Sequence, residues 1–199
     1  MRLPDPTIDG NVSLEMTIHQ RRTVRSFGSK TLTLTQFSQL LWASQGVTDP
    51  GGFKRAAPSA GALYPIDIYG AVGEDCVEGL HPGIYLYDPA IHSLSLTQQG
   101  DARKGIAVAS LGQIWMSYAP ITFVITAEYS RITGKYGQRG IRYAMIEAGH
   151  IGQNIFLQSQ ALGLEAGIVG AFQDREVIQI MGIKSTHEPL LIMPVGYKK

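Results

Sequence analysis

Three arginines lie within five residues near the start of the chain, at Arg21, Arg22 and Arg25. A guanidinium group donates paired hydrogen bonds, a geometry that suits phosphate oxygens better than any other side chain does. At a junction between a helix and a loop, these arginines would form a seat for a phosphorylated ligand. A solvated basic surface explains the segment alone equally well, because basic clusters are common on protein surfaces.

A second segment, from Pro58 to Pro65, consists mostly of small residues between prolines. A flat ligand could lie against such a backbone, with the Ser59 hydroxyl and free amides as hydrogen-bond donors. A rigid turn before a strand explains the same residues, and that interpretation is favoured when the segment is considered alone.

Two further segments contain residue types that could take part in chemistry. Lys135 stands next to Tyr136, which gives two adjacent proton donors, and burial would lower the pKa of such a lysine. The loop from Gly163 to Ala171 has three glycines, whose N–H groups could face an anion or an electron-rich ring atom. An ordinary polar loop before a helix explains the Lys135–Tyr136 pair equally well. A helix C-cap followed by a turn is the favoured explanation of the loop from Gly163 to Ala171 when that loop is considered alone.

Several common classes of site are not supported by the sequence. His150 follows Glu147 by three residues, a spacing found in some metal sites, but no second such pair exists, so we predict no metal site. The single cysteine, Cys76, excludes an internal disulfide. Neither a nucleophile elbow nor a glycine-rich nucleotide motif is present. The net charge of +1 argues against general binding of nucleic acid.

The length of 199 residues allows one domain or two small lobes, and we predict a single domain, 1–199, in which residues 1–12 form a leader or a dimer arm. Only 17% of the residues are charged, which suggests that part of the surface is buried in an oligomer. Residues 105–127 carry no charge, but Pro120 divides them, and a helix followed by a buried strand is favoured over a membrane span. No apolar signal core follows Met1, so cytoplasm is the expected compartment.

Hydrophobic periodicity and turn residues predict the elements that must position these segments. Three helices are expected at 13–20, from about residue 101, and at about 140–162. A fourth should begin at a capping box formed by Thr33 and Gln36 and end at Gly46, and a fifth should begin at a cap at Asp174 and end near Gly182. Strands are expected at 66–72, 83–87, 93–96, 121–126 and 190–193, the second and third forming an antiparallel hairpin. On the longest helix, Gly149 and Gly152 would permit close approach by another helix or chain. Because helices and strands mix without strict alternation, the predicted fold class is α+β.

Together these segments resemble the nitroreductase-like flavoprotein superfamily from about Arg21 to Gly196. The arginine segment is similar to its N-terminal flavin motif, Pro58 and Ser59 to its Pro-Ser motif, and 161–172 to its C-terminal flavin loop. Within the superfamily, residues 58–65, 83–87, 135–140 and 147–154 are most similar to the SagB/ThcOx branch, which includes azoline dehydrogenases of peptide maturation.

The resemblance implies a mostly antiparallel central sheet flanked by helices, in an intertwined homodimer with two FMN molecules at its interface. It assigns Arg21, Arg22 and Thr23 to the phosphate and ribityl end of FMN and Arg25 to the pyrimidine edge of the ring, where positive charge stabilises the reduced anion. The remaining residues that it assigns to the cofactor are Pro58, Ser59, Ala60 and Gly61 from the partner subunit, Gly170 and Ala171 near N5, and Lys198 (with Lys199 as the alternative) at the phosphate.

The function that this resemblance implies is an FMN-dependent oxidoreductase that transfers hydride by a ping-pong mechanism, with NAD(P)H as donor and nitro, quinone or related acceptors. An azoline-type dehydrogenase is the alternative within the same chemistry, and there Lys135 and Tyr136 would assist proton removal. A dimer that binds flavin or another planar ligand without catalysis is an alternative of another class.

Overall fold

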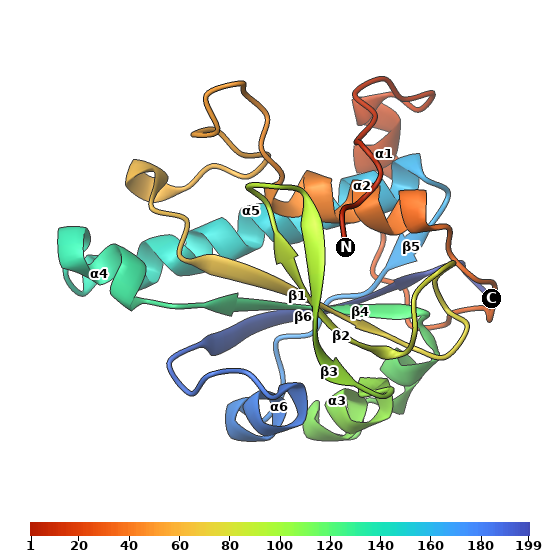
Figure 1. Ribbon diagram of the computed structural model, residues 1–199. Helices are drawn as coiled ribbons and strands as arrows, with labels where there is room; N and C mark the ends of the chain where they lie inside the picture. Colours follow the sequence, from red (N-terminus) through yellow and green to blue (C-terminus); the bar gives the residue numbers. More distant parts are fainter.

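A six-stranded antiparallel sheet forms the centre of the molecule (Figure 1). The computed structural model describes residues 1–199. The strands are β1 (Ile66–Val72), β2 (Gly83–Asp88), β3 (Ser93–Gln99), β4 (Ile121–Ala127), β5 (Glu165–Ala166) and β6 (Glu188–Gly196). Their order across the sheet is β3-β2-β1-β4-β6-β5. The predicted α+β class and the β2–β3 hairpin are therefore confirmed.

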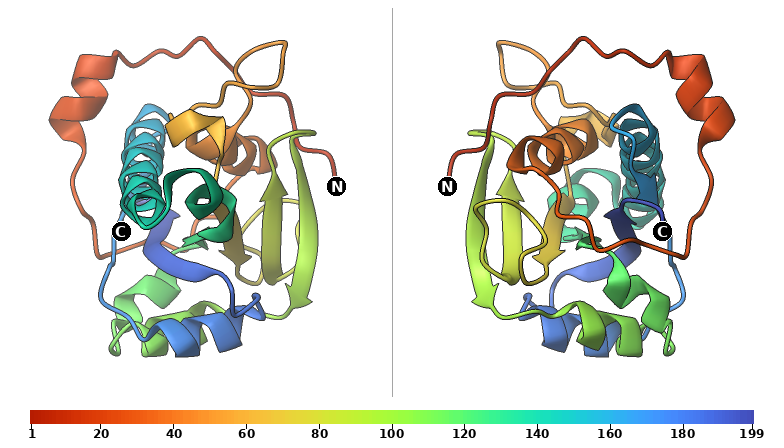
Figure 2. Two further views of the ribbon diagram at one scale, coloured as in Figure 1. Left: turned by 90° about the vertical axis from the view of Figure 1, so that its left-hand side faces the viewer. Right: turned by 90° about the vertical axis from the view of Figure 1, so that its right-hand side faces the viewer.

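Helices cover both faces of this sheet (Figures 1 and 2). On one face lie α2 (Leu34–Gln45) and the long α5 (Arg139–Ala161), and on the other lie α3 (Arg103–Ala109) and α6 (Asp174–Met181). Four shorter elements lie at the edges: α1 (Leu14–Gln20), the 3₁₀ turns η1 (Ala60–Ala62) and η2 (Ile114–Tyr118), and α4 (Ser130–Tyr136).

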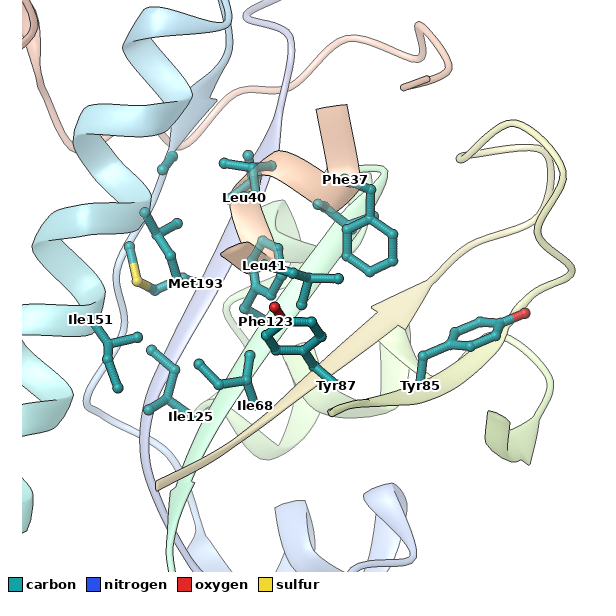
Figure 3. Packing of buried hydrophobic residues seen from close by; sticks show 14 of the residues in the cluster. Phe37, Leu40, Leu41, Ile68, Tyr85, Tyr87, Phe123, Ile125, Ile151 and Met193 are labelled. Atoms are coloured by element: carbon teal, nitrogen blue, oxygen red, sulfur yellow. The ribbon is translucent and has the colours of Figure 1, made fainter. Parts of the chain in front are cut away.

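The strands bury residues on both faces because their side chains alternate. Ile68 of β1 and Ile125 of β4 are opposite each other and pack beneath α2 and α5 with Phe37 and Ile151 (Figure 3). The next residues, Tyr69 and Val124, also form a pair and belong to the second core beneath α3 and α6. This packing fixes the position of α5 on one face of the sheet.

The capping box correctly predicted the start of α2, and the apolar periodicity correctly predicted α5. The Thr33 hydroxyl accepts a hydrogen bond from the Gln36 amide at 3.1 Å, and the Gln36 side-chain oxygen accepts one from the Thr33 amide at 3.0 Å. This capping box begins α2, and the Gly46 amide closes the helix by donating to the Trp42 carbonyl. Gly137, with a φ of 55°, makes the sharp turn between α4 and α5.

Several elements differ from the predictions. Strand β6 runs from Glu188 to Gly196 and includes Pro194, whereas the sequence predicted 190–193. Pro194 lacks an N–H, but its carbonyl accepts a bond from the Gly167 amide, so the proline is compatible with this strand. Asp174 is the first residue of α6, and Gln173 occupies the cap. Lys135 and Tyr136 lie on the short helix α4, which the sequence did not predict.

The N-terminal residues pair with the edge strand of their own sheet. The Leu3 amide donates to the His92 carbonyl at 3.0 Å, and the Leu94 amide donates to the Met1 carbonyl at 2.8 Å. The Ser38 hydroxyl donates to the Pro4 carbonyl at 2.6 Å and fixes the end of this segment. Helix α1 follows and stands apart from the sheet (Figure 2). No helix of the structure is both long and apolar enough to span a membrane. Residues 105–127 include most of α3 and all of β4, the expected helix and buried strand, and also the turn η2, which was not predicted.

Candidate functional site

The arginine segment lies where α1 ends and the chain returns to the sheet. The Val24 amide donates to the Ala166 carbonyl of β5 at 3.0 Å, which fixes the segment against the edge of the sheet. The Arg21 guanidinium lies 5.1 Å from the centre of the Phe156 ring of α5. Arg22 instead donates to the carbonyls of His19 and Arg21, both at 2.8 Å. In this structure, Arg21 belongs to the wall beside α5, whereas Arg22 caps the end of α1.

Arg25 lies in a pocket of about 470 Å³ that combines positive charge with aromatic walls. Its guanidinium lies 5.8 Å from the centre of the Trp115 ring, which stacks on Phe27. The C-terminal residues complete this pocket, because Lys198 pairs with Phe27 and Lys199 lines the cavity. A pocket of this composition can bind a ligand that has an aromatic part and an anionic part.

The glycine-containing loop after α5 approaches the same pocket. A Cβ atom at Gly167 would lie 2.8 Å from the Val24 carbonyl oxygen and 2.9 Å from the Trp115 ring, so only glycine fits there. Gly170 and Ala171 are exposed, and the Ala171 carbonyl accepts a bond from the Gln113 side chain at 3.3 Å. The structure therefore brings the arginine segment, the C-terminal lysines and this loop together, and we call them the arginine half-site (residues 21–25, 115, 167–171 and 198–199).

The segment from Pro58 to Gly61 lies elsewhere and contacts the Lys135–Tyr136 pair of the same chain. Gly61 has a φ of 63°, and a Cβ atom added there would lie 2.7 Å from the Tyr136 hydroxyl and 3.0 Å from the Lys135 ammonium. The Ser59 hydroxyl accepts a bond from the Tyr64 amide at 2.9 Å and stabilises the turn. Two segments predicted independently thus form one surface, which we call the lysine half-site (residues 58–61 and 135–136).

Within the lysine half-site, the ring of Tyr136 packs edge-on against Tyr143 at 5.2 Å between centres. The Lys135 ammonium lies 5.4 Å from the Tyr136 ring, and its side chain is exposed. The single chain does not provide the burial of Lys135 on which the sequence argument depended. A ligand or a second chain would have to cover it.

The two half-sites lie at opposite ends of α5 (Figure 1). At one end, Gly140 packs against Ile132 of α4, and at the other Phe156 contacts Arg21. These helical positions are 16 residues apart, which corresponds to about 24 Å at about 1.5 Å per residue. One chain therefore does not bring the arginine half-site and the lysine half-site together around one small ligand.

The sequence analysis missed a buried polar cluster behind the lysine half-site. Glu147 of α5 is only 1% exposed, and its Oε1 accepts a bond from the Gln45 amide group at 2.9 Å. Burial raises the pKa of Glu147 to about 7, while Ser59, Gln45 and Arg55 act in the opposite direction. The signal was present in the sequence, because Glu147 interrupts the apolar face that contains Ala144, Ala148 and Ile151. His150 is exposed, so it does not share a metal site with the buried Glu147.

A second cluster that the sequence did not predict joins α4 to the sheet. Arg131 donates two hydrogen bonds to the Asp67 carboxylate, at 2.7 and 2.8 Å, and one to Glu128 at 2.8 Å. The His187 ring lies 3.3 Å from Asp67 and 3.4 Å from Glu128. Such an arrangement of three possible ligands could suit a metal ion, but Arg131 already pairs with both carboxylates. The cluster therefore fixes the start of α4 and, through α4, the position of Lys135 and Tyr136.

Comparison with known proteins identifies the family. A model of the nitroreductase family matches residues 18–197. The chain is 43% identical to the "Putative nitroreductase MJ1384" of Methanocaldococcus jannaschii, over 100% of this chain and 97% of that protein. It is 26% identical to McbC, the microcin B17-processing protein of Escherichia coli, over 83% of this chain and 62% of McbC.

Solved structures show the same fold. The crystal structure of a "putative nitroreductase" from Ralstonia eutropha superposes with a TM-score of 0.86 and 30% identity, over 99% of this chain and 88% of the other. A chain of the McbBCD microcin synthetase complex of E. coli superposes with a TM-score of 0.79 and 24% identity, over 97% of this chain and 75% of the other. At this lower identity the second comparison supports the fold alone.

Proposed function

Because the chain belongs to the nitroreductase family, we propose that it is an FMN-dependent oxidoreductase whose cofactor site is completed by two copies of the chain. The observation that carries this proposal is the separation of two complementary half-sites along α5. The arginine half-site offers cations and aromatic walls, and the lysine half-site offers an open backbone next to two proton donors. An antiparallel arrangement of two α5 helices would place the arginine half-site of one chain against the lysine half-site of the other.

The residues of the arginine half-site fit FMN. Arg21 and Arg25 offer guanidinium donors, and Lys198 and Lys199 add charge for a phosphate. Trp115 supplies an aromatic wall beside Arg25. When bound, FMN would supply two-electron transfer between a nicotinamide and an acceptor. The protein residues would bind and orient FMN, and the positive charge of Arg25 would stabilise negative charge on its ring.

The exposed apolar residues support a dimer. Leu14 on α1 is 60% exposed, and Met145 and Ile146 on α5 are each about half exposed. A Cβ atom at Gly149, one turn beyond Met145, would meet nothing within 4 Å, whereas one at Gly152 would meet Leu191 and Met193 of β6. The face of α5 that contains Gly149 is thus open in the single chain, and exposed apolar patches of this kind mark interfaces.

The visible spectrum of the purified protein, followed by anaerobic titration with NADH and NADPH, tests the proposed activity. We expect a yellow protein whose flavin absorbance is bleached by one nicotinamide and restored by a nitroaromatic or a quinone. A colourless protein that takes up no FMN would contradict the proposal and would support a dimer that binds another planar ligand. A yellow protein that neither nicotinamide bleaches would exclude the nicotinamide-linked reductase.

An azoline-type dehydrogenase is the second candidate, and the contact of Gly61 with Lys135 and Tyr136 favours it. The similarity to the microcin B17-processing protein McbC supports the same candidate. In that reaction, Lys135 and Tyr136 would remove a proton from the ring that is oxidised. Lys135→Ala and Tyr136→Phe should then abolish oxidation of a thiazoline or oxazoline peptide, while bound FMN and its bleaching by nicotinamide persist. Full azoline oxidation by both variants would rule out this assignment.

A further inference from the structure

The carboxyl group of Glu147 lies behind Ser59 with one oxygen unpaired. Oε1 accepts a hydrogen bond from Gln45, but Oε2 is buried and has no hydrogen-bond partner. The Ser59 hydroxyl is one of the groups that favour the ionised form of this carboxyl, although no hydrogen bond joins the two groups in the structure. A buried polar atom without a hydrogen-bond partner is unfavourable, so the position of Oε2 calls for an explanation.

The hydrogen-bonding capacity of Ser59 provides this explanation. A hydroxyl has one proton to donate and two lone pairs that accept. The Tyr64 amide occupies one lone pair of Ser59 Oγ at 2.9 Å. If Glu147 is ionised, it can only accept, and it attracts the Ser59 proton inward. If Glu147 is protonated, Oε2 can donate to the second lone pair, and the Ser59 proton is then free to point outward.

We propose that Glu147 is a positioning residue that sets the direction of the Ser59 hydroxyl, so that Ser59 donates to a bound flavin only when Glu147 is protonated. The inference rests on the proposed function, which places FMN against Pro58–Gly61. Ser59 itself is half-buried, with Pro58 and Gly61 exposed on either side, so its hydroxyl can reach either the carboxyl or a ligand.

The surroundings of Glu147 leave its charge largely uncompensated. Arg55 is the one charged group that stabilises the Glu147 carboxylate, and Gln45 stands between them, since Arg55 donates to the Gln45 oxygen at 3.3 Å. The Arg55 guanidinium itself lies 4.0 Å from the centre of the Tyr64 ring, and Tyr87 and Asp67 also act on it. Desolvation of the carboxyl therefore prevails and raises the pKa of Glu147 to about 7, within the range where the protein is expected to work.

The test is a titration of the ligand-free protein with FMN, and separately with riboflavin, between pH 6 and pH 8.5. Riboflavin lacks the phosphate, so its binding does not report phosphate ionisation. In the unsubstituted protein we expect the affinity to fall about fivefold as pH rises, because about one hydrogen bond to the flavin is lost. Glu147→Gln should bind at the low-pH affinity throughout, because the amide donates permanently to Ser59. Ser59→Ala should bind at the high-pH affinity throughout, because it has no hydroxyl.

Glu176→Gln serves as the matched control, since Glu176 is exposed on α6 and its loss should leave the pH dependence unchanged. Affinity that does not vary with pH in the unsubstituted protein, or an unchanged pH dependence in Glu147→Gln, would overturn the inference while FMN binding persists. Failure to bind either flavin at every pH would overturn the proposed function together with it. Should Glu147→Gln not fold, the comparison of the unsubstituted protein with Ser59→Ala decides.

Discussion

Replacing Gly149 with arginine should leave the chain folded but monomeric and without FMN. A side chain at this position meets nothing within 4 Å in the single chain, so the fold has room for it. Replacing a glycine inside a helix with a good helix former even stabilises the helix, by up to about 1 kcal/mol. In an interface formed by α5, however, the new guanidinium would be buried without a partner, at a cost of about 3 kcal/mol or more. Association should therefore weaken at least about 100-fold.

Light scattering coupled to gel filtration measures the mass, and absorbance measures the bound flavin. Val108→Arg is the matched control, because it places the same side chain at an exposed position on α3, on the other face of the sheet. That variant should remain a yellow dimer. If Gly149→Arg also remains a yellow dimer, α5 does not form the interface around this residue.

Replacing Glu147 with glutamine should make the ligand-free protein more stable at pH 8 and about equally stable at pH 5. The pKa of Glu147 is raised from its ordinary value of 4.5 to about 7, chiefly by burial. Between these values the folded protein binds more protons than the unfolded chain does, so stability falls as pH rises through this window. The full cost, on the order of 3 kcal/mol, is present above about pH 8. The amide never ionises and avoids this cost, and its oxygen can still accept the bond from Gln45.

Urea unfolding at pH 5 and at pH 8 measures the difference. In the unsubstituted protein the free energy of unfolding should fall between the two values, and in Glu147→Gln this part of the fall should disappear. Glu176→Gln should show the same fall as the unsubstituted protein, because Glu176 is exposed on α6, on the opposite face of the sheet. Parallel behaviour of all three proteins would show that Glu147 does not titrate in this range.

Local signals in the sequence were enough to predict most elements of the fold. The capping box at Thr33 and Gln36, the strand after Pro120 and the glycine at the end of α6 depend on neighbouring residues, and all three occur in the structure. The full length of β6 was not predictable, because its pairing with β4 and the Gly167 amide, rather than local preference, extends it through Pro194.

For the site, the sequence identified the segments but not the way in which they meet. The contact of Gly61 with Tyr136 joins residues 75 positions apart and depends on how α4 packs on α5. The environment of the Ser59 hydroxyl includes the Glu147 carboxyl, and nothing in the sequence indicated that these two residues are close. Arg22 lies back on the end of α1, an orientation that the residue type alone does not determine.

Because the two half-sites are separated along α5, we propose that two chains together form each cofactor site. A heterodimer of two defective chains tests it most directly. One chain carries Arg21→Ala and Arg25→Ala, which remove the guanidinium groups of the arginine half-site. The other carries Gly61→Val, which places a bulky side chain against Tyr136 and Lys135. The two chains carry different tags, are co-expressed, and are purified through both tags.

Each variant alone should form a dimer without FMN. In the heterodimer, one site combines both defects, and the other combines the two intact half-sites. The predicted result is a heterodimer with half the FMN content of the unsubstituted dimer. A heterodimer that holds no FMN, with both chains folded and associated, would contradict the claim, because it would show that each cofactor site is built within a single chain.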